Sequence, residues 1–211
     1  VEAPLGSRTK LTLPDGTLVW LNAGSRITYS QGFGVGNRKI ELIGEGYFEV
    51  KRNEEVPFLV KTNSLLVKVL GTKFNFRDYP DDAEAIVSLS EGKVALNNLL
   101  KKEKEAFLLP NERVVLNKKN GRMHVEYSTV SNALQWTNGY LFFDEELLPD
   151  VVKELERSYN VKIQIASDTL NTFRFYGNFV HREQNIQEVL EALSATRKIH
   201  YIIEGHNITL Y

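Results

Sequence analysis

Side chains able to do chemistry are few in this sequence. Its histidines are His124, His181, His200 and His206, and no two have the i, i+4 spacing that places both imidazoles on one helix face. The spacing lets His200 and His206 face each other across a hairpin, but we expect them to be ordinary solvent-facing strand residues rather than metal ligands. The sequence therefore predicts no metal ion and no cofactor.

Neither the clustered acids nor the glycine-rich segment predicts an enzyme. Asp144, Glu145 and Glu146 are adjacent, whereas paired catalytic carboxylates normally come from separate elements. Acids are favoured at a helix start, so we expect Asp144 to cap the helix that follows. Segment 31–37, QGFGVGN, lacks the following helix of a phosphate loop and is interpreted as a hairpin tip. No nucleophile can be paired with a base, which argues against a hydrolase.

One dipeptide does suggest chemistry. Gly71 and Thr72 interrupt the strand-like run VKVLGTKFNF, at 67–76. The simpler interpretation is a β-bulge that redirects Thr72. The alternative is self-cleavage, in which the Thr72 hydroxyl attacks the carbonyl carbon of Gly71 in an N→O acyl shift and frees the Thr72 amine. Water then hydrolyses the resulting ester and separates the two pieces of chain. Both interpretations stay open at this point.

Length and composition describe a globular protein with one large domain or two small ones. The chain has 211 residues, of which 42% are hydrophobic and 25% charged, with a net charge of −1. That balance gives no electrostatic footprint for nucleic acid or an anionic membrane. No apolar run approaches the roughly 20 residues that span a bilayer. The absence of cysteine excludes disulfides, thiolate zinc sites and cysteine nucleophiles.

Residues 1–130 predict an all-β domain. Short runs with period-two alternation recur at spacings typical of a sandwich or of a stacked-hairpin solenoid. The run LTLPDGTLVWL, at 11–21, predicts a hairpin that turns through Pro14, Asp15 and Gly16. In the run RKIELIGEGYFEV, at 38–50, Gly44 and Gly46 are expected to break the strand.

Residues 131–211 predict a small βαββαβ domain, so the fold class is β plus α/β in two domains. Two apolar stripes with helical spacing begin at Leu148 and Ile186, and the halves around them match at an offset of 38 residues. Each half is interpreted as strand–helix–strand, with the helices packed on one face of a single sheet. A final strand, 207–211, extends that sheet.

Several stretches together resemble a known family. They are LPDGTLVWLNAGSRITY (13–29), RKIELIGEGYFEV (38–50), PFLVKTNSLLVKVLGTKFNF (57–76), VSLSEGKVAL (87–96), LLPNERV (108–114) and WTNGYLFFDEELLPDVVKELERSYNVKI (136–163). The first five stretches resemble the FecR-type periplasmic domain of anti-sigma factors. The last resembles the small domain related to the short N-terminal domain of secretins and TonB-dependent transducers.

This resemblance implies a periplasmic sensor tethered to the inner membrane. In such proteins a cytoplasmic segment holds an extracytoplasmic-function sigma factor, and one membrane helix follows it; Val1 would lie just after that helix. The periplasmic part senses the signalling domain of an outer-membrane TonB-dependent transporter, in systems that regulate iron or glycan uptake. Some members cleave themselves at a Gly-Thr pair in the position that Gly71 and Thr72 match.

Strand FRFYGNF, at 173–179, is the predicted docking element. Its alternation places the phenylalanines on one face and Arg174, Tyr176 and Asn178 on the other. Arginine and tyrosine are enriched at binding hot spots. An ordinary internal strand would show the same alternation.

A different class of function also remains: Trp20, Tyr29, Phe33 and Tyr47 would form a stacking platform for a carbohydrate or another ligand.

Overall fold

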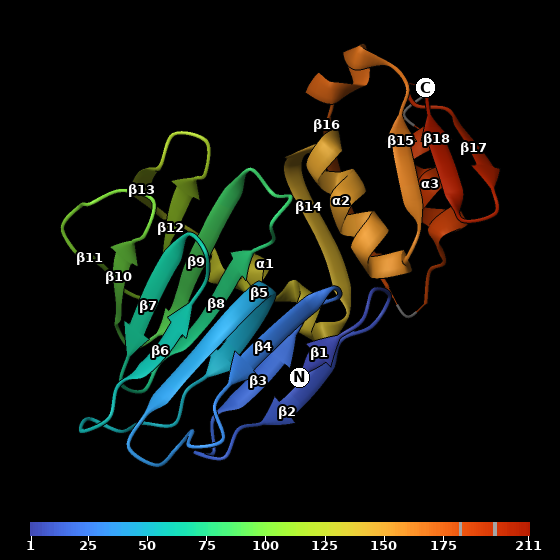
Figure 1. Ribbon diagram of the computed structural model, residues 1–211. Coiled ribbons are helices and arrows are strands. Elements are labelled where there is room, and N and C mark those ends of the chain that lie inside the picture. The colour runs from blue at the N-terminus through green and yellow to red at the C-terminus, as the bar shows by residue number, and fades with distance from the viewer. Residues whose placement is uncertain (182, 196–197) are drawn as a thin grey trace. The chain divides into compact units, whose positions relative to one another are not determined.

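The computed structural model describes residues 1–181, 183–195 and 198–211, without the side chains of residues 130 and 131 (Figure 1). The chain divides into two compact units. Residues 1–4 and 8–134 form the first unit, and residues 5–7 and 135–211 form the second. Most of the first unit is strand and the second mixes strands with helices, so the expected change from β to α/β along the chain is confirmed in these general terms.

The described residues of the first unit form strands followed by one short helix. Several strands keep the period-two alternation of buried and exposed residues that the sequence shows. In chain order the elements are β1 Glu2–Ala3, β2 Thr9–Thr12, β3 Leu18–Leu21, β4 Ser25–Tyr29, β5 Arg38–Glu49, β6 Phe58–Lys61, β7 Leu65–Val69, β8 Lys73–Asp78, β9 Glu84–Glu91, β10 Val94–Asn98, β11 Ala106–Leu108, β12 Glu112–Asn117, β13 Arg122–Tyr127 and α1 Val130–Ala133.

Strand β5 belongs to two layers at once. Its first half pairs with β4 and β6, in the order β1-β4-β5-β6-β7-β10-β11. Its second half pairs with β3 and β8, in the order β2-β3-β5-β8-β9-β12-β13. One continuous apolar core contains residues of both layers, among them Val19, Ile27, Val60, Val67, Phe74, Val87, Leu96 and Val114.

The expectation that Gly44 and Gly46 break the strand is wrong. Strand β5 continues through both glycines and changes layer where Gly44 has a φ of +96°. A Cβ on Gly44 would lie 2.8 Å from the Cβ of Ser25. A residue without a side chain is therefore required here to let the backbone pass from one layer to the other.

The second unit contains the expected succession of elements. They are the 3₁₀ helix η1 Gln135–Asn138, β14 Tyr140–Leu147, α2 Leu148–Tyr159, β15 Lys162–Ile165, the 3₁₀ helix η2 Asp168–Thr172, β16 Arg174–Val180, α3 Ile186–Ser194, β17 Tyr201–Glu204 and β18 Asn207–Leu210. Helices α2 and α3 begin 38 positions apart, as the sequence repeat predicts.

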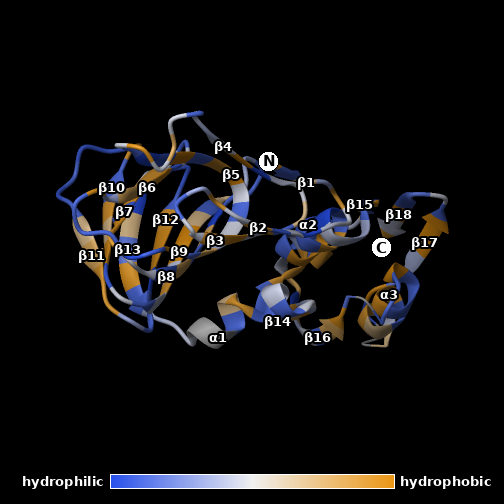
Figure 2. Ribbon diagram, turned by 90° about the horizontal axis from the view of Figure 1, so that it is seen from below, coloured by the Kyte–Doolittle hydropathy of each residue, from blue (hydrophilic) through white to orange (hydrophobic). Residues whose placement is uncertain are grey.

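The expected single sheet of this unit is replaced by two sheets. Strands β14 and β16 form an antiparallel pair, and β15, β18 and β17 form a separate three-stranded sheet. The last strand, β18, lies in the middle of that sheet, parallel to β15 and antiparallel to β17. The two helices and residues of both sheets share one apolar core. Each helix accordingly has an apolar side and a polar side (Figure 2).

Only one of the two helix starts has a side-chain cap. Asn185 accepts a hydrogen bond from the Glu188 amide at 3.1 Å while Glu188 bonds back to the Asn185 amide, which is a capping box on α3. Helix α2 starts after Leu147 without such a cap and has Pro149 in its first turn. The expectation that Asp144 caps α2 is therefore wrong, since Asp144 lies within β14.

Candidate functional site

Strand β16 has one paired edge and one open edge. Its antiparallel partner is β14, and no other strand among the described residues pairs with it. The amide of His181 donates to the Gly139 carbonyl at 2.9 Å, and the Leu148 amide donates to the Phe173 carbonyl at 2.8 Å. Alternate residues of a strand direct their backbone groups to opposite edges. The even-numbered residues therefore face the open edge; they are Arg174, Tyr176, Asn178 and Val180.

Backbone groups on this open edge are satisfied only at its end. The Val180 amide donates to the side chain of Gln184 at 2.8 Å, and the Val180 carbonyl accepts from the Gln184 amide at 3.0 Å. Among the described residues, no backbone hydrogen bond is formed at this edge by Arg174, Tyr176 or Asn178. Three consecutive outward-facing positions thus present donors and acceptors to solvent.

The side chains of the same three residues are also exposed. Arg174, Tyr176 and Asn178 lie on the solvent side of β16, and Tyr176 is 59% exposed. On the other side Phe175 and Phe179 are buried in the core of the unit. The structure therefore brings the three residues predicted from sequence together on one exposed face, beside unpaired backbone groups.

A β-bulge in β14 completes this face. The pairing with β16 shifts register between Phe143 and Glu146, and Glu145 takes a φ of +57°. The Arg174 Nη1 donates to the Glu145 carbonyl at 2.6 Å. A hydrogen bond with the Glu145 carboxylate, together with its charge, raises the pKa of the Tyr176 phenol. The bulge therefore places Glu145 beside both the arginine and the tyrosine side chain.

The role of the three adjacent acids was missed in the sequence because a helix follows them directly. They belong to the bulged part of β14, and two of them act on Tyr176: Glu145 through its hydrogen bond and charge, and Asp144 through its charge. The local signal was Glu145 and its acidic neighbours at the end of an apolar alternating run. That signal does not distinguish a bulge from a helix start, because both accept polar residues.

Gly71 and Thr72 lie in the connection between β7 and β8, so the expectation of a bulge at this pair is wrong. The nearby register shift falls between Lys73 and Phe74, where β8 pairs with β9. Thr72 is 4% exposed, and its hydroxyl donates to the Lys93 carbonyl at 3.1 Å. Within the described part of the chain, no carboxylate or imidazole forms a hydrogen bond with that hydroxyl.

The proposed aromatic platform is not assembled as an open surface. Phe33 is 3% exposed and Tyr47 is 7% exposed, and Phe33 belongs to the core of the first unit. Trp20 packs on Tyr47 with ring centroids 5.3 Å apart, while Tyr29 packs on Phe33 at 5.2 Å. These four residues therefore form two separate packing pairs, each with one ring buried.

The histidine positions do not form a metal site among the described residues, where no group of three ligating side chains could hold an ion. His200 and His206 do not face each other across the hairpin, because the His200 ring packs instead on Tyr211 with centroids 5.8 Å apart. The backbone of His200 also pairs with Tyr211, in both directions, at 2.9 and 3.0 Å.

Two family models match this chain along most of its length. The model described as FecR protein matches residues 1–95, and the model described as FecR, C-terminal matches residues 140–210. The chain belongs to the FecR family. The two matches include most of the stretches that carry the resemblance, although 108–114 lies outside both, and the second match includes the whole of β14 and β16.

Solved structures agree with the FecR assignment. Crystal structures at 1.65 and 2.50 Å resolution, of a protein assigned as an anti-sigma factor in Parabacteroides distasonis ATCC 8503, are similar to this chain, with TM-scores of 0.91 and 0.90. Sequence identity is 34% in both, over 100% of this chain and 97% of the other. No curated protein sequence matches the chain.

These matches define the chain as a sensor region of a FecR-family anti-sigma factor in cell-surface signalling, a regulatory family. FecR proteins are membrane-anchored sensors with a periplasmic region. Among the described residues, no helix has the length and apolar character needed to cross a bilayer.

Proposed function

We propose that this chain binds the signalling domain of an outer-membrane TonB-dependent transporter through β16 and its open edge. The chain is then the periplasmic receiver, tethered by a membrane helix that precedes it in the full-length protein. A cytoplasmic segment beyond that helix holds the extracytoplasmic-function sigma factor. The observation that carries the proposal is the coincidence, at three residues, of unpaired backbone groups and an exposed arginine and tyrosine.

Strand addition is the physical basis of this binding. A partner strand laid along β16 satisfies the outward backbone groups of Arg174, Tyr176 and Asn178, and main-chain hydrogen bonds of this kind provide affinity. The side chains on the exposed face provide specificity. Because Arg174 already donates to the Glu145 carbonyl, part of its side-chain entropy is lost before the partner binds.

A carbohydrate-binding module is the second candidate, and the burial of Phe33 and Tyr47 argues against it. Sugar stacking needs exposed ring faces, whereas one ring of each aromatic pair is covered. A glycan array probed with the purified chain tests this candidate directly. Binding that is lost in a Trp20→Ala variant would favour it over the protein-binding function.

The main experiment compares two double variants in titrations with the purified signalling domain of the transporter encoded beside this gene. Arg174→Ala/Tyr176→Ala removes the two side chains from β16. We expect its dissociation constant to rise at least tenfold, with the thermal unfolding temperature nearly unchanged because both side chains are exposed. Unchanged affinity would exclude this surface.

A matched control is available on the first unit. Arg122→Ala/Tyr127→Ala removes the same two residue types from β13, which is also an outermost strand, and both residues are exposed. We expect this control to bind with the affinity of the unmodified chain. An equal loss of affinity in both double variants would mean that β16 has no special role.

Hydrogen exchange tests the backbone part of the proposal. In the free chain the amides of Arg174, Tyr176 and Asn178 should exchange rapidly, because none of the described residues bonds to them at the open edge. The transporter signalling domain should slow all three. Protection confined to other strands would contradict strand addition to β16.

A further inference from the structure

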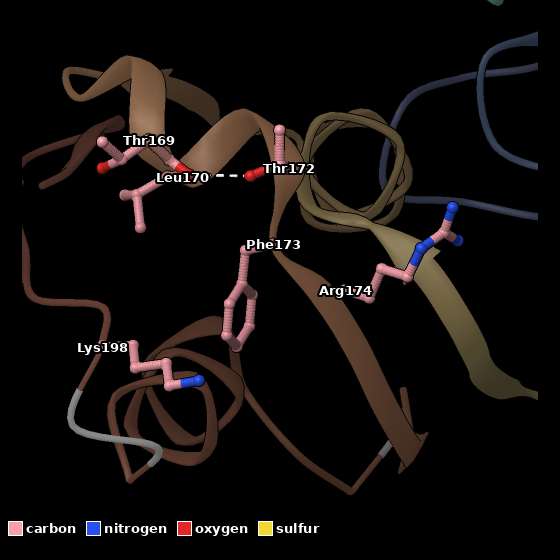
Figure 3. Close-up of a pocket in the computed structure, with 6 residues that line it drawn as sticks. All are labelled: Thr169, Leu170, Thr172, Phe173, Arg174 and Lys198. Carbon is pink, nitrogen blue, oxygen red and sulfur yellow. Dashed lines mark hydrogen bonds between the residues drawn. The ribbon is translucent and has the colours of Figure 1, made fainter.

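An open cavity lies beside the first residues of β16 (Figure 3). Its volume is about 510 Å³, within the range of roughly 300–1,000 Å³ typical of ligand-binding sites. It lies between η2, the start of β16 and Lys198. The lining residues are Thr169, Leu170, Thr172, Phe173, Arg174 and Lys198.

The lining of the cavity is part apolar and part polar. Leu170 is 7% exposed and Phe173 is half-buried, and both pack into the core of the unit. The Lys198 ammonium lies 5.7 Å from the centre of the Phe173 ring. Figure 3 shows the Arg174 guanidinium turned away from Phe173, and it donates instead to the Glu145 carbonyl. Leu170 and Phe173 thus supply the apolar part of the lining.

The cavity adjoins the start of β16, where the open edge begins. Phe173 lines the cavity and is followed directly by Arg174, the first residue of β16 whose backbone groups have no partner among the described residues. A strand laid along this edge and continued past Arg174 therefore brings a side chain over Phe173. In strand addition, main-chain bonds give affinity and pockets for side chains give specificity.

Resting on the proposed function, we propose that the partner strand inserts one large apolar side chain into this cavity, against Leu170 and Phe173. This side chain sets the register of the added strand, because a slip by one residue would turn it to the opposite face. The transporter that this receiver recognises is then distinguished by an apolar anchor at one position of its docking strand.

The test fills the cavity without altering the edge. In the full 211-residue chain, Thr169→Trp places an indole at the cavity. Asn171→Trp introduces the same side chain on η2, at a residue outside the lining of the cavity. Both positions are exposed, so the fold should tolerate either. We expect Thr169→Trp to weaken binding of the transporter signalling domain at least tenfold and Asn171→Trp to weaken it less than twofold.

Alanine substitution along the partner strand identifies the anchor. At one apolar position, the alanine variant of the signalling domain should bind the unmodified chain at least tenfold more weakly than the unaltered signalling domain does. The same alanine change should weaken binding to the Thr169→Trp variant only slightly, because the two changes remove the same contact. Equal affinity of Thr169→Trp, Asn171→Trp and the unmodified chain, with β16 amides still protected, would overturn the anchor and leave strand addition in place. Absence of binding by the unmodified chain would overturn both.

Discussion

Phe175 and Phe179 stack on the buried face of β16 with their ring planes 4° apart and their centroids 6.1 Å apart. Gly177 lies between them in the strand. A Cβ there would be 2.6 Å from Phe175 and 2.8 Å from Phe179. The glycine therefore lets the two rings pack beneath the exposed side of the strand.

Gly177→Ala is expected to destabilise the second unit by about 1–3 kcal/mol, the usual cost of overpacking a core. Both rings are almost fully buried, so neither can turn freely to admit a methyl group. Urea unfolding of the variant measures the loss. Asn178→Ala on the exposed face is the control and should change the stability by less than about 0.5 kcal/mol. A Gly177→Ala variant as stable as the unmodified chain would show that the rings separate readily.

Arg38 should be essential for the stability of the first unit. It is 3% exposed, pairs with Asp15 at 3.3 Å, and donates to the carbonyls of Lys51, Asn53 and Val56. Arg38→Met removes the charge, leaves the Asp15 carboxylate without its cation and the carbonyls without their donor, and should cost about 3–5 kcal/mol.

Asp15→Asn should destabilise the first unit less than Arg38→Met does, because Arg38 keeps three carbonyl partners. Urea unfolding of both variants gives the comparison. If Asp15→Asn proved the more destabilising of the two, the ion pair rather than the carbonyl bonds would be what holds this region.

Tyr176 should titrate above the ordinary phenol pKa, because Glu145 accepts its proton in a hydrogen bond and disfavours the phenolate. Folding thus favours the neutral phenol. The resulting stabilisation is present below the pKa of the unfolded chain and is lost as the pH rises through the folded pKa. The difference in alkaline absorbance titration between the unmodified chain and Tyr176→Phe reports this pKa. Glu145→Gln should lower it, and an unchanged value would contradict the hydrogen bond.

The Gly71–Thr72 bond should remain intact in this chain. The Thr72 hydroxyl donates to the Lys93 carbonyl, and no described side chain accepts a hydrogen bond from it as a base would. Incubation of the purified chain for several days, followed by a denaturing gel, should give one band, as for Thr72→Ala. Two fragments, one with Thr72 at its new N-terminus and both absent in Thr72→Ala, would establish self-cleavage instead.

Local patterns were enough to predict most elements. The hairpin from Leu11 to Leu21 and the two apolar helix stripes were predicted because turn residues and side-chain periods act over a few neighbouring residues. The alternation in β16 likewise predicted which side chains share a face. Whether that face binds a partner remains a prediction.

Strand partners were decided only by the tertiary structure. The sequence did not indicate that β5 joins two layers, that β18 lies between β15 and β17, or that β14 and β16 form a sheet of their own. Pairing depends on contacts between residues distant in the chain, whereas spacing reports only the local period. For the same reason the alternation placed Arg174 and Tyr176 on one face, but only the assembled unit gives them an open edge, a fixed bulge at Glu145 and a neighbouring cavity.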